Sequence, residues 1–257
     1  MRPGLVSLLQ TMGGTPIWCA EEVAAQASDS STISSTFTQL DKELPGKGWP
    51  RGQLVELLVS HAGVGELSLL APALAQLAHS GRTNVWIMPG ESVRASHAHL
   101  VPYAPALTAG GVDLAHTIFV KPSTPSEGLW AFEKALRAEH LGAVIGWVSV
   151  GQRSDNDFKA LQRLHVLAQR NLALAFVFRE TLDASAPSPA ALRLQLSGSG
   201  AHLKIDLLKR RGRPLPDPIF VPLHPLHWST SSVSLDHQKA AAEPKLISPP
   251  SFAVTAV

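Results

Sequence analysis

The stretch HAGVGELSLL, residues 61–70, keeps the glycines of a phosphate-binding loop and raises the question of whether it is one. It follows an apolar run and precedes an amphipathic segment, as a nucleotide-binding loop does. In a working loop, glycines let backbone N–H groups surround the phosphates, a lysine supplies positive charge, and a Ser or Thr hydroxyl binds magnesium. Gly63 and Gly65 keep the turn, but Glu66 stands in the lysine position and Leu67 in the hydroxyl position.

The charge in the lysine position is therefore reversed. Two like charges about 4 Å apart repel by roughly 4 kcal/mol at an effective dielectric constant of about 20, so a carboxylate at Glu66 opposes triphosphate binding. The same carboxylate can interact with the unpaired N–H groups and positive end of the following helix. We predict no productive ATP binding, no enzymatic activity and no cofactor. The residues also fit an ordinary strand-to-helix turn that never held a nucleotide.

A nucleotide site also needs an acidic residue after a second apolar strand, where it holds the metal's water shell. The run GAVIGWVSV at 142–150 offers Trp147 and Ser149 in that place. Glu91, just after WIMPG, could replace the missing acid, or it could be a solvated loop residue. No catalytic residue is predicted.

The densest basic cluster consists of Lys204, Lys209, Arg210, Arg211 and Arg213. Such side chains can contact the phosphates of DNA, which makes binding depend on salt. The cluster could equally meet an acidic protein partner or remain solvated. These three interpretations stay open.

Two histidine pairs could be taken for metal ligands. They are His97 with His99 and His224 with His227. Neither pair has acidic or cysteine companions at a suitable spacing, so no metal site is predicted. A serine nucleophile is not predicted either, because the chain has no Gly-x-Ser-x-Gly turn.

Composition narrows the class of protein. The chain has 257 residues, is 45% hydrophobic and 16% charged, and carries a formal net charge of +2, which is typical of a globular protein. Cys19 is the only cysteine, so an intramolecular disulfide is impossible and a cysteine-rich zinc site is excluded. No apolar run approaches the length of a membrane span, and the opening residues do not read as an export signal. We expect a cytoplasmic protein.

Short apolar runs alternate with longer helix-like segments in the middle of the chain. The runs are LVELLV at 54–59, TNVWIM at 83–88, HTIFV at 116–120, GAVIGWV at 142–148 and LALAFVF at 172–178. Because they are apolar on both faces and widely spaced, they predict an α/β fold with a mainly parallel sheet and helices on both faces. Alternating runs at 192–196 and 202–208 predict a short antiparallel hairpin after that sheet.

Two apolar stripes at helical spacing predict helices that cover the sheet. The stripes are Leu67, Leu70, Leu74 and Leu77, and Phe158, Leu161, Leu164 and Leu167. Each fully buried large side chain contributes roughly 1.5 to 3 kcal/mol before entropy is counted. Pro72 predicts a kink or a delayed start in the first helix.

The chain divides by composition into three parts. We expect an amino-terminal arm at 1–33, a folded domain at 34–222 and a disordered tail at 223–257, which is rich in Ser, Ala and Pro.

Several segments in one order resemble a known family. QLDKELPGKGWPRGQLVEL at 39–57 is similar to the entry segment of RecA-like recombinases. Together with Gly-Val-Gly-Glu-Leu in place of the lysine loop, PYAPAL with GVDL at 102–114, and LLKRRGRP at 207–214, it resembles the ImuA family. These proteins are RecA-related accessory factors of bacterial damage-induced mutagenesis. The resemblance covers residues 36 to about 222.

The resemblance implies a RecA-like fold with a degenerate phosphate loop and a non-catalytic role in mutagenic translesion DNA synthesis during the SOS response to DNA damage. The implied partners are an ImuB-type inactive Y-family polymerase and a DnaE-type error-prone polymerase. RecA and single-stranded DNA are further candidates, and no membrane is expected. Two alternatives stay open, a SulA-like division inhibitor that binds FtsZ and a RecA-like DNA-dependent ATPase.

The resemblance also gives the amino-terminal arm a role. In RecA-like proteins a leading helix packs on a neighbouring subunit, so the apolar residues of the arm could dock on a partner. These residues are Leu5, Leu8, Leu9 and Trp18. The arm could equally fold back on its own core. Residues 184–190, which lie where RecA-like proteins contact DNA, carry no positive charge.

Overall fold

The computed structural model describes residues 32–61, 63–89, 102–147 and 155–223, with the side chains of 155 and 156 left out. By its contacts the chain divides at His227 into two units, Met1–His227 and Trp228–Val257. All described residues belong to the first unit. The predicted arm residues Leu5, Leu8, Leu9 and Trp18 and almost all of the predicted tail lie outside the described ranges.

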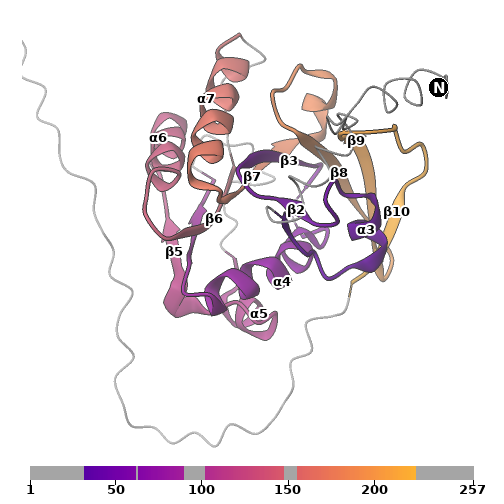
Figure 1. Cartoon of the computed structure of the whole chain (residues 1–257), viewed down its shortest axis with the longest axis horizontal. Coiled ribbons are helices and arrows are strands. Elements are labelled where there is room, and N and C mark those ends of the chain that lie inside the picture. The colour runs from indigo at the N-terminus through magenta and orange to yellow at the C-terminus, as the bar shows by residue number, and fades with distance from the viewer. Residues whose placement is uncertain (1–31, 62, 90–101, 148–154, 224–257) are drawn as a thin grey trace, which may run out of the picture. The chain divides into compact units, whose positions relative to one another are not determined.

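An eight-stranded sheet forms the centre of the first unit (Figure 1). Its spatial order is β10-β9-β8-β3-β7-β6-β4-β5. The strands are β3 (Gln53–Val59), β4 (Thr83–Ile87), β5 (Thr117–Val120), β6 (Leu141–Trp147), β7 (Leu174–Glu180), β8 (Leu192–Ser199), β9 (His202–Lys209) and β10 (Ile219–Pro222). The six strands from β8 to β5 run parallel, whereas β9 and β10 pair antiparallel.

Helices cover both faces of this sheet, and each face has its own core. On one face α4 (Glu66–His79) buries Leu70, Leu74 and Leu77, beside α3 (Thr38–Glu43) and α5 (Ala104–Ala109). On the other face α6 (Pro125–Ala135) and α7 (Asp155–Asn171) contribute Phe132, Leu161, Leu164 and Leu167. Figure 1 shows α6 and α7 on the opposite side of the sheet from α4 and α5.

The sequence explains where two of these helices begin. Thr124 caps α6 by accepting a hydrogen bond from the Glu127 N–H, and Pro125 takes the first helical position, where its missing N–H costs nothing. Helix α4 starts directly after Gly65 and continues through Pro72, so its start is not delayed. Pro72 leaves the Ser68 carbonyl without its usual helical donor.

The mainly parallel α/β sheet and the antiparallel hairpin are therefore confirmed, with helices on both faces. The structure adds β10, α3, α5 and a small antiparallel sheet of β1 (Thr32–Ile33) and β2 (Trp49–Pro50). Thr32 and Ile33, which we assigned to the arm, pair with Pro50 and Trp49. Phe158, expected in the core stripe of the second helix, is 37% exposed in the first turn of α7.

Candidate functional site

The degenerate loop lies between the carboxyl end of β3 and the amino end of α4. Gly63 and Gly65 have φ angles of 83° and 111°, in the left-handed region that glycine tolerates. This backbone path turns two N–H groups toward the first residue of α4. The Gly63 N–H donates to Glu66 Oε1 at 2.9 Å, and the Gly65 N–H donates to Glu66 Oε2 at 3.0 Å.

The Glu66 carboxylate therefore accepts the N–H groups that an anionic ligand would need. Glu66 is only 3% exposed, so its carboxylate is buried. The negative charge also lies at the helix amino terminus, where the macrodipole stabilises it. A phosphate entering this loop would have to displace an internal anion of like charge.

Apolar residues complete the surroundings of the loop. Leu67, in the predicted hydroxyl position, is partly buried and packs against the core that contains α4. A side chain added at Gly65 would meet the Leu223 side chain at 2.5 Å, so the residue after β10 lies against the loop. Aliphatic side chains, and not a hydroxyl, therefore border the loop.

The second half of a nucleotide site is only partly described. Trp147 ends β6, is 9% exposed, and stacks on Phe178 with ring centroids 4.5 Å apart. Ser149 and Glu91, the other two residues considered for this half, lie outside the described residues. Trp147 provides a packed aromatic ring in the strand, not a carboxylate.

A buried charge network, which we did not predict, lies beneath the α7 face of the sheet. It joins Glu56 in β3, Arg193 in β8 and Arg179 in β7. Glu56 is fully buried, and its Oε2 accepts from Arg193 Nε at 2.7 Å. Ser188 donates to the other Glu56 oxygen. The carboxylate is thus paired and hydrogen-bonded, as a buried charge must be.

The Arg193 guanidinium also holds the segment after β7. Its Nη1 donates to the Ala184 and Ala186 carbonyls, and its Nη2 to the Asp183 carbonyl, at 2.9–3.1 Å. Part of this segment is the short 3-10 helix η2 (Thr181–Ser185). Residues 184–190 therefore supply carbonyls and a hydroxyl to an internal network.

Arg179 extends the network toward α7. Its Nη2 lies 3.5 Å from Asp157 and 3.2 Å from Asp183. Burial raises the pKa of Asp157, which Arg179 opposes and Asp183 reinforces. The sequence signal was a charge inside each of three apolar strand runs, because such charges must find partners when buried.

The predicted basic cluster does not form one surface. Lys204 lies 3.1 Å from Asp206, whereas Arg210 binds the Glu43 carbonyl and carboxylate beside α3. Lys209 donates to the Ser188 carbonyl. Arg211 and Arg213 are exposed, with no ion pair or hydrogen bond of their side chains within the described ranges.

The basic residues from Lys209 onward also lie far from the degenerate loop. Lys209 pairs with Arg193 near the start of β8, which runs parallel to β3. The loop follows Val59 at the opposite end of β3. At about 3.3 Å per residue, the two ends of β3 are about 20 Å apart. The loop and the basic residues therefore belong to opposite edges of the sheet.

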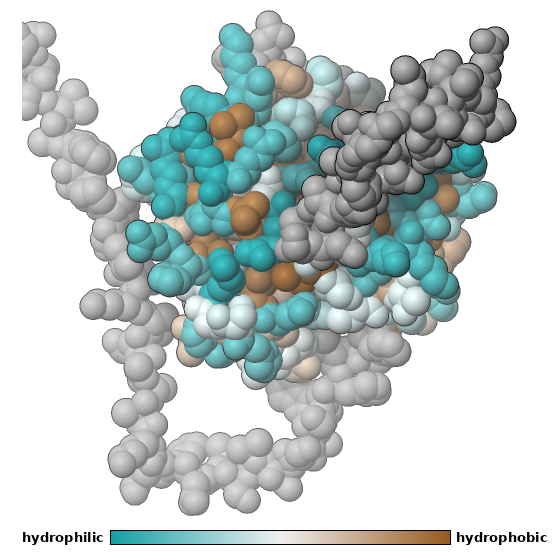
Figure 2. Space-filling model, viewed as in Figure 1, coloured by the Kyte–Doolittle hydropathy of each residue, from teal (hydrophilic) through white to brown (hydrophobic). Residues whose placement is uncertain are grey.

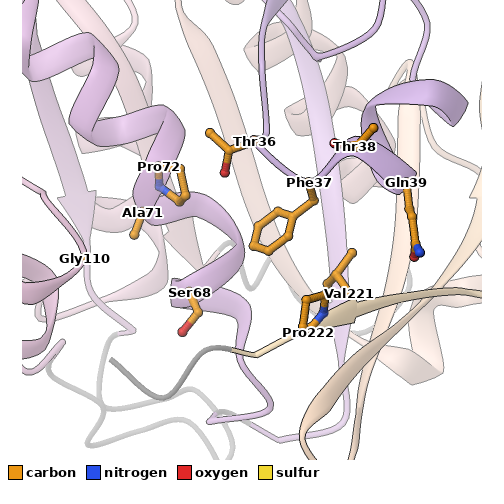
Figure 3. Close-up of a pocket in the computed structure, with 10 residues that line it drawn as sticks. All are labelled: Thr36, Phe37, Thr38, Gln39, Ser68, Ala71, Pro72, Gly110, Val221 and Pro222. Carbon is orange, nitrogen blue, oxygen red and sulfur yellow. The ribbon is translucent and has the colours of Figure 1, made fainter. Parts of the chain in front are cut away.

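A cavity of about 400 Å³ lies on the α4 face. Figure 3 shows the Phe37 ring between α4 and β10, with Ser68 and Pro72 on one side and Val221 on the other. Its other lining residues are Thr36, Thr38, Gln39, Ala71, Gly110 and Pro222. None of the lining side chains is charged, so this cavity offers no group for acid–base chemistry.

The remaining candidate features can be placed only in part. Glu91 and the four paired histidines, His97, His99, His224 and His227, lie outside the described residues. Within the described ranges, no group of three or more His, Cys, Asp or Glu side chains is arranged to hold a metal ion. No helix there is long and apolar enough to cross a membrane. The face drawn in Figure 2 is mostly hydrophilic, with small separate hydrophobic areas.

Comparison with known proteins assigns no family to this chain. No protein-family model matches this sequence, and no curated protein matches it significantly. Function is therefore inferred from the residues and their geometry.

Proposed function

We propose that the chain is a RecA-like, non-catalytic accessory protein of the ImuA type, which assembles with an ImuB-type protein and a DnaE-type polymerase in mutagenic translesion synthesis. The mainly parallel α/β sheet is compatible with this fold. The resemblance of residues 36 to about 222 supports the family, and the loop after β3 supports the absence of catalysis.

One observation carries the non-catalytic part of the proposal. The Glu66 carboxylate accepts both the Gly63 and the Gly65 N–H and is buried at the start of α4. An ATPase needs those donors for phosphate oxygens and a lysine for charge neutralisation. In this chain the donors are already paired, and the lysine position carries the opposite charge.

The proposed function is tested by assembly with the two partner proteins and not by ATP hydrolysis. The full chain, immobilised, should retain a purified ImuB-type protein from the same cell, and the resulting pair should retain the DnaE-type polymerase. The same full chain should show no magnesium-dependent ATP binding by calorimetry. Failure to retain either protein would overturn the proposed assembly.

Calorimetry needs a positive control from the same scaffold. The double variant Glu66→Lys with Leu67→Thr restores the residue types of a phosphate loop and frees the Gly63 and Gly65 N–H groups. We expect it to bind Mg-ATP more tightly than the parent. Tight Mg-ATP binding by the parent itself would favour the DNA-dependent ATPase, and direct binding of purified FtsZ would favour the division inhibitor.

A further inference from the structure

We propose that a basic cavity at the amino edge of the parallel sheet binds a phosphate group, supplied by a single-stranded nucleic acid or by a free phosphorylated ligand. The cavity has a volume of about 350 Å³. It is lined by Arg51, Gly52, Gln53, His165, Gln169, Leu172, Pro189, Ala191 and Arg211. This inference goes beyond the accessory function and is independent of the loop at the other edge.

Four segments that are distant in sequence build the cavity. Arg51 and Gly52 precede β3, Leu172 precedes β7, Pro189 and Ala191 precede β8, and Arg211 follows β9. His165 and Gln169 come from the second half of α7. Because parallel strands begin at the same edge, their preceding loops meet there and bring these cationic and amide groups together.

The backbone positions Arg51 at the mouth of the cavity. Gly52 has a φ of +69°, and its N–H donates to the Ala173 carbonyl at 2.9 Å. A Cβ at this glycine would lie 3.1 Å from the Leu172 side chain, so the turn suits glycine. Arg51 Nε donates to the Leu172 carbonyl at 2.8 Å. No other hydrogen bond or ion pair of this guanidinium occurs within the described ranges, which leaves its two Nη groups for a ligand.

His165 and Gln169 also line the cavity. The Leu54 N–H donates to His165 Nδ1 at 3.3 Å, and His165 Nε2 lies 3.3 Å from Gln169 Nε2. These contacts hold the ring at the wall of the cavity, with the Gln169 amide beside it.

The charge of the cavity is unbalanced. No acidic side chain is among its lining residues, whereas Arg51 and Arg211 both are. Burial lowers the pKa of Arg51, and nearby Arg82 lowers it further. Burial also lowers the pKa of His165, with Lys209 and Arg211 acting in the same direction. An anion with several oxygens would relieve this repulsion and accept hydrogen bonds from a planar guanidinium.

The test uses the full chain and two probes. Binding of a labelled oligothymidylate is followed by fluorescence polarisation, and binding of inorganic phosphate by NMR of the His165 ring. We expect phosphate to raise the His165 pKa, because the anion favours the protonated ring. The double variant Arg51→Gln with Arg211→Gln should lose about tenfold or more in affinity for whichever probe binds.

Matched variants separate this site from general charge effects. Arg163→Gln removes an exposed arginine of α7 that pairs with Glu133 of α6 and does not line the cavity, so it should leave both affinities unchanged. Arg211→Gln alone changes only an exposed side chain, so its loss of affinity cannot come from misfolding. Oligothymidylate binding whose salt dependence becomes shallower in the double variant, by about 0.7 in the log–log slope for the one phosphate lost, identifies a nucleic-acid strand as the source.

Each of the remaining outcomes either supports the phosphate site or overturns it. Phosphate binding at His165 without oligothymidylate binding identifies a free phosphorylated ligand as the source. If neither probe binds, or if the double variant and Arg163→Gln behave alike, the site does not exist. None of these results depends on retention of the ImuB-type protein, so failure here is distinguishable from failure of the proposed assembly.

Discussion

Glu66 shows how a single side chain can turn an anion-binding turn into a closed structural element. The left-handed conformations of Gly63 and Gly65 present two N–H groups, and the next residue satisfies both. Each of these hydrogen bonds contributes about 0.5 to 1.5 kcal/mol, because Gly63 is exposed and Gly65 is only partly buried, so water competes for the two N–H groups. The carboxylate therefore accepts N–H groups of the kind that a phosphate accepts in a nucleotide-binding loop.

The variant Glu66→Ala tests whether the loop N–H groups can bind an anion from solution once the carboxylate is removed. We expect the free energy of unfolding to fall by about 1 to 2 kcal/mol in urea denaturation, because two donors at a partly exposed turn lose a charged acceptor that water replaces only in part. Sulfate should restore part of that stability in the variant by occupying the vacated donors. Glu139→Ala, at an exposed position, is the matched control. Equal sulfate effects on Glu66→Ala and the parent would contradict this account of the loop.

His165 predicts how stability depends on pH. Its pKa is lowered in the folded protein by burial, Lys209 and Arg211, whereas the unfolded value is about 6.5. Between these two values the unfolded chain binds more protons, so the free energy of unfolding decreases as pH falls through that interval. His165→Gln should flatten this part of the profile, and His202→Gln, at an exposed position, should not. An NMR pKa of His165 at or above 6.5 would contradict the prediction.

Among the elements, η2 depends on contacts from outside itself. It has only five residues, too few to be stable alone. The Arg193 guanidinium accounts for its position, because one planar group donates to the carbonyls of Asp183, Ala184 and Ala186 while its Nε pairs with Glu56. The buried ion pair therefore positions the connection between β7 and β8.

Replacing Arg193 separates charge from geometry. Arg193→Met should lower the free energy of unfolding by about 3 to 5 kcal/mol, because the buried Glu56 loses a partner. Arg193→Lys keeps the charge but not the planar fork, so amide exchange should accelerate selectively at residues 183–190. Arg213→Met, an exposed control, should change neither measurement. Uniform acceleration of exchange throughout the domain in Arg193→Lys would contradict a local role.

At the scale of the whole molecule, one sheet has a hydrophobic core on each face and a candidate site at each end of its parallel strands. The degenerate loop lies at the carboxyl edge of β3, and the basic cavity at the amino edge. The two proposals therefore concern different ends of the parallel strands. The cores on the two faces share every central strand, so loss of packing on either face should destabilise the same sheet.

Core substitutions test that shared dependence. Leu74→Ala in α4 and Leu164→Ala in α7 should each lower the free energy of unfolding by about 2 to 5 kcal/mol, because both leucines are fully buried. Their effects should add, since the side chains lie on opposite faces and share no contact. Leu208→Ala, at a residue that is 43% exposed, is the control. Separate unfolding transitions for the two faces, seen by amide exchange, would contradict a shared sheet.

Local chemistry made much of this arrangement predictable. The apolar runs anticipated five parallel strands within a few residues, because burial on both faces leaves a continuous apolar signature. The reversed charge at Glu66 could be read directly, since the glycines and the carboxylate are neighbours along the chain. Short elements such as β10 and α3 were missed because four to six residues carry too little periodicity.

The charge network and the basic cavity depended instead on contacts between distant residues. Glu56 meets Arg193 only because β3 and β8 are adjacent and in register at that pair. Lys204 and Arg211 lie apart because Lys204 is near the start of β9, whereas Arg211 follows its last residue. Adjacency along the chain specifies neighbouring backbone groups, but strand order and register determine which side chains meet across the sheet. Those two features follow from packing of the whole domain, not from any single segment.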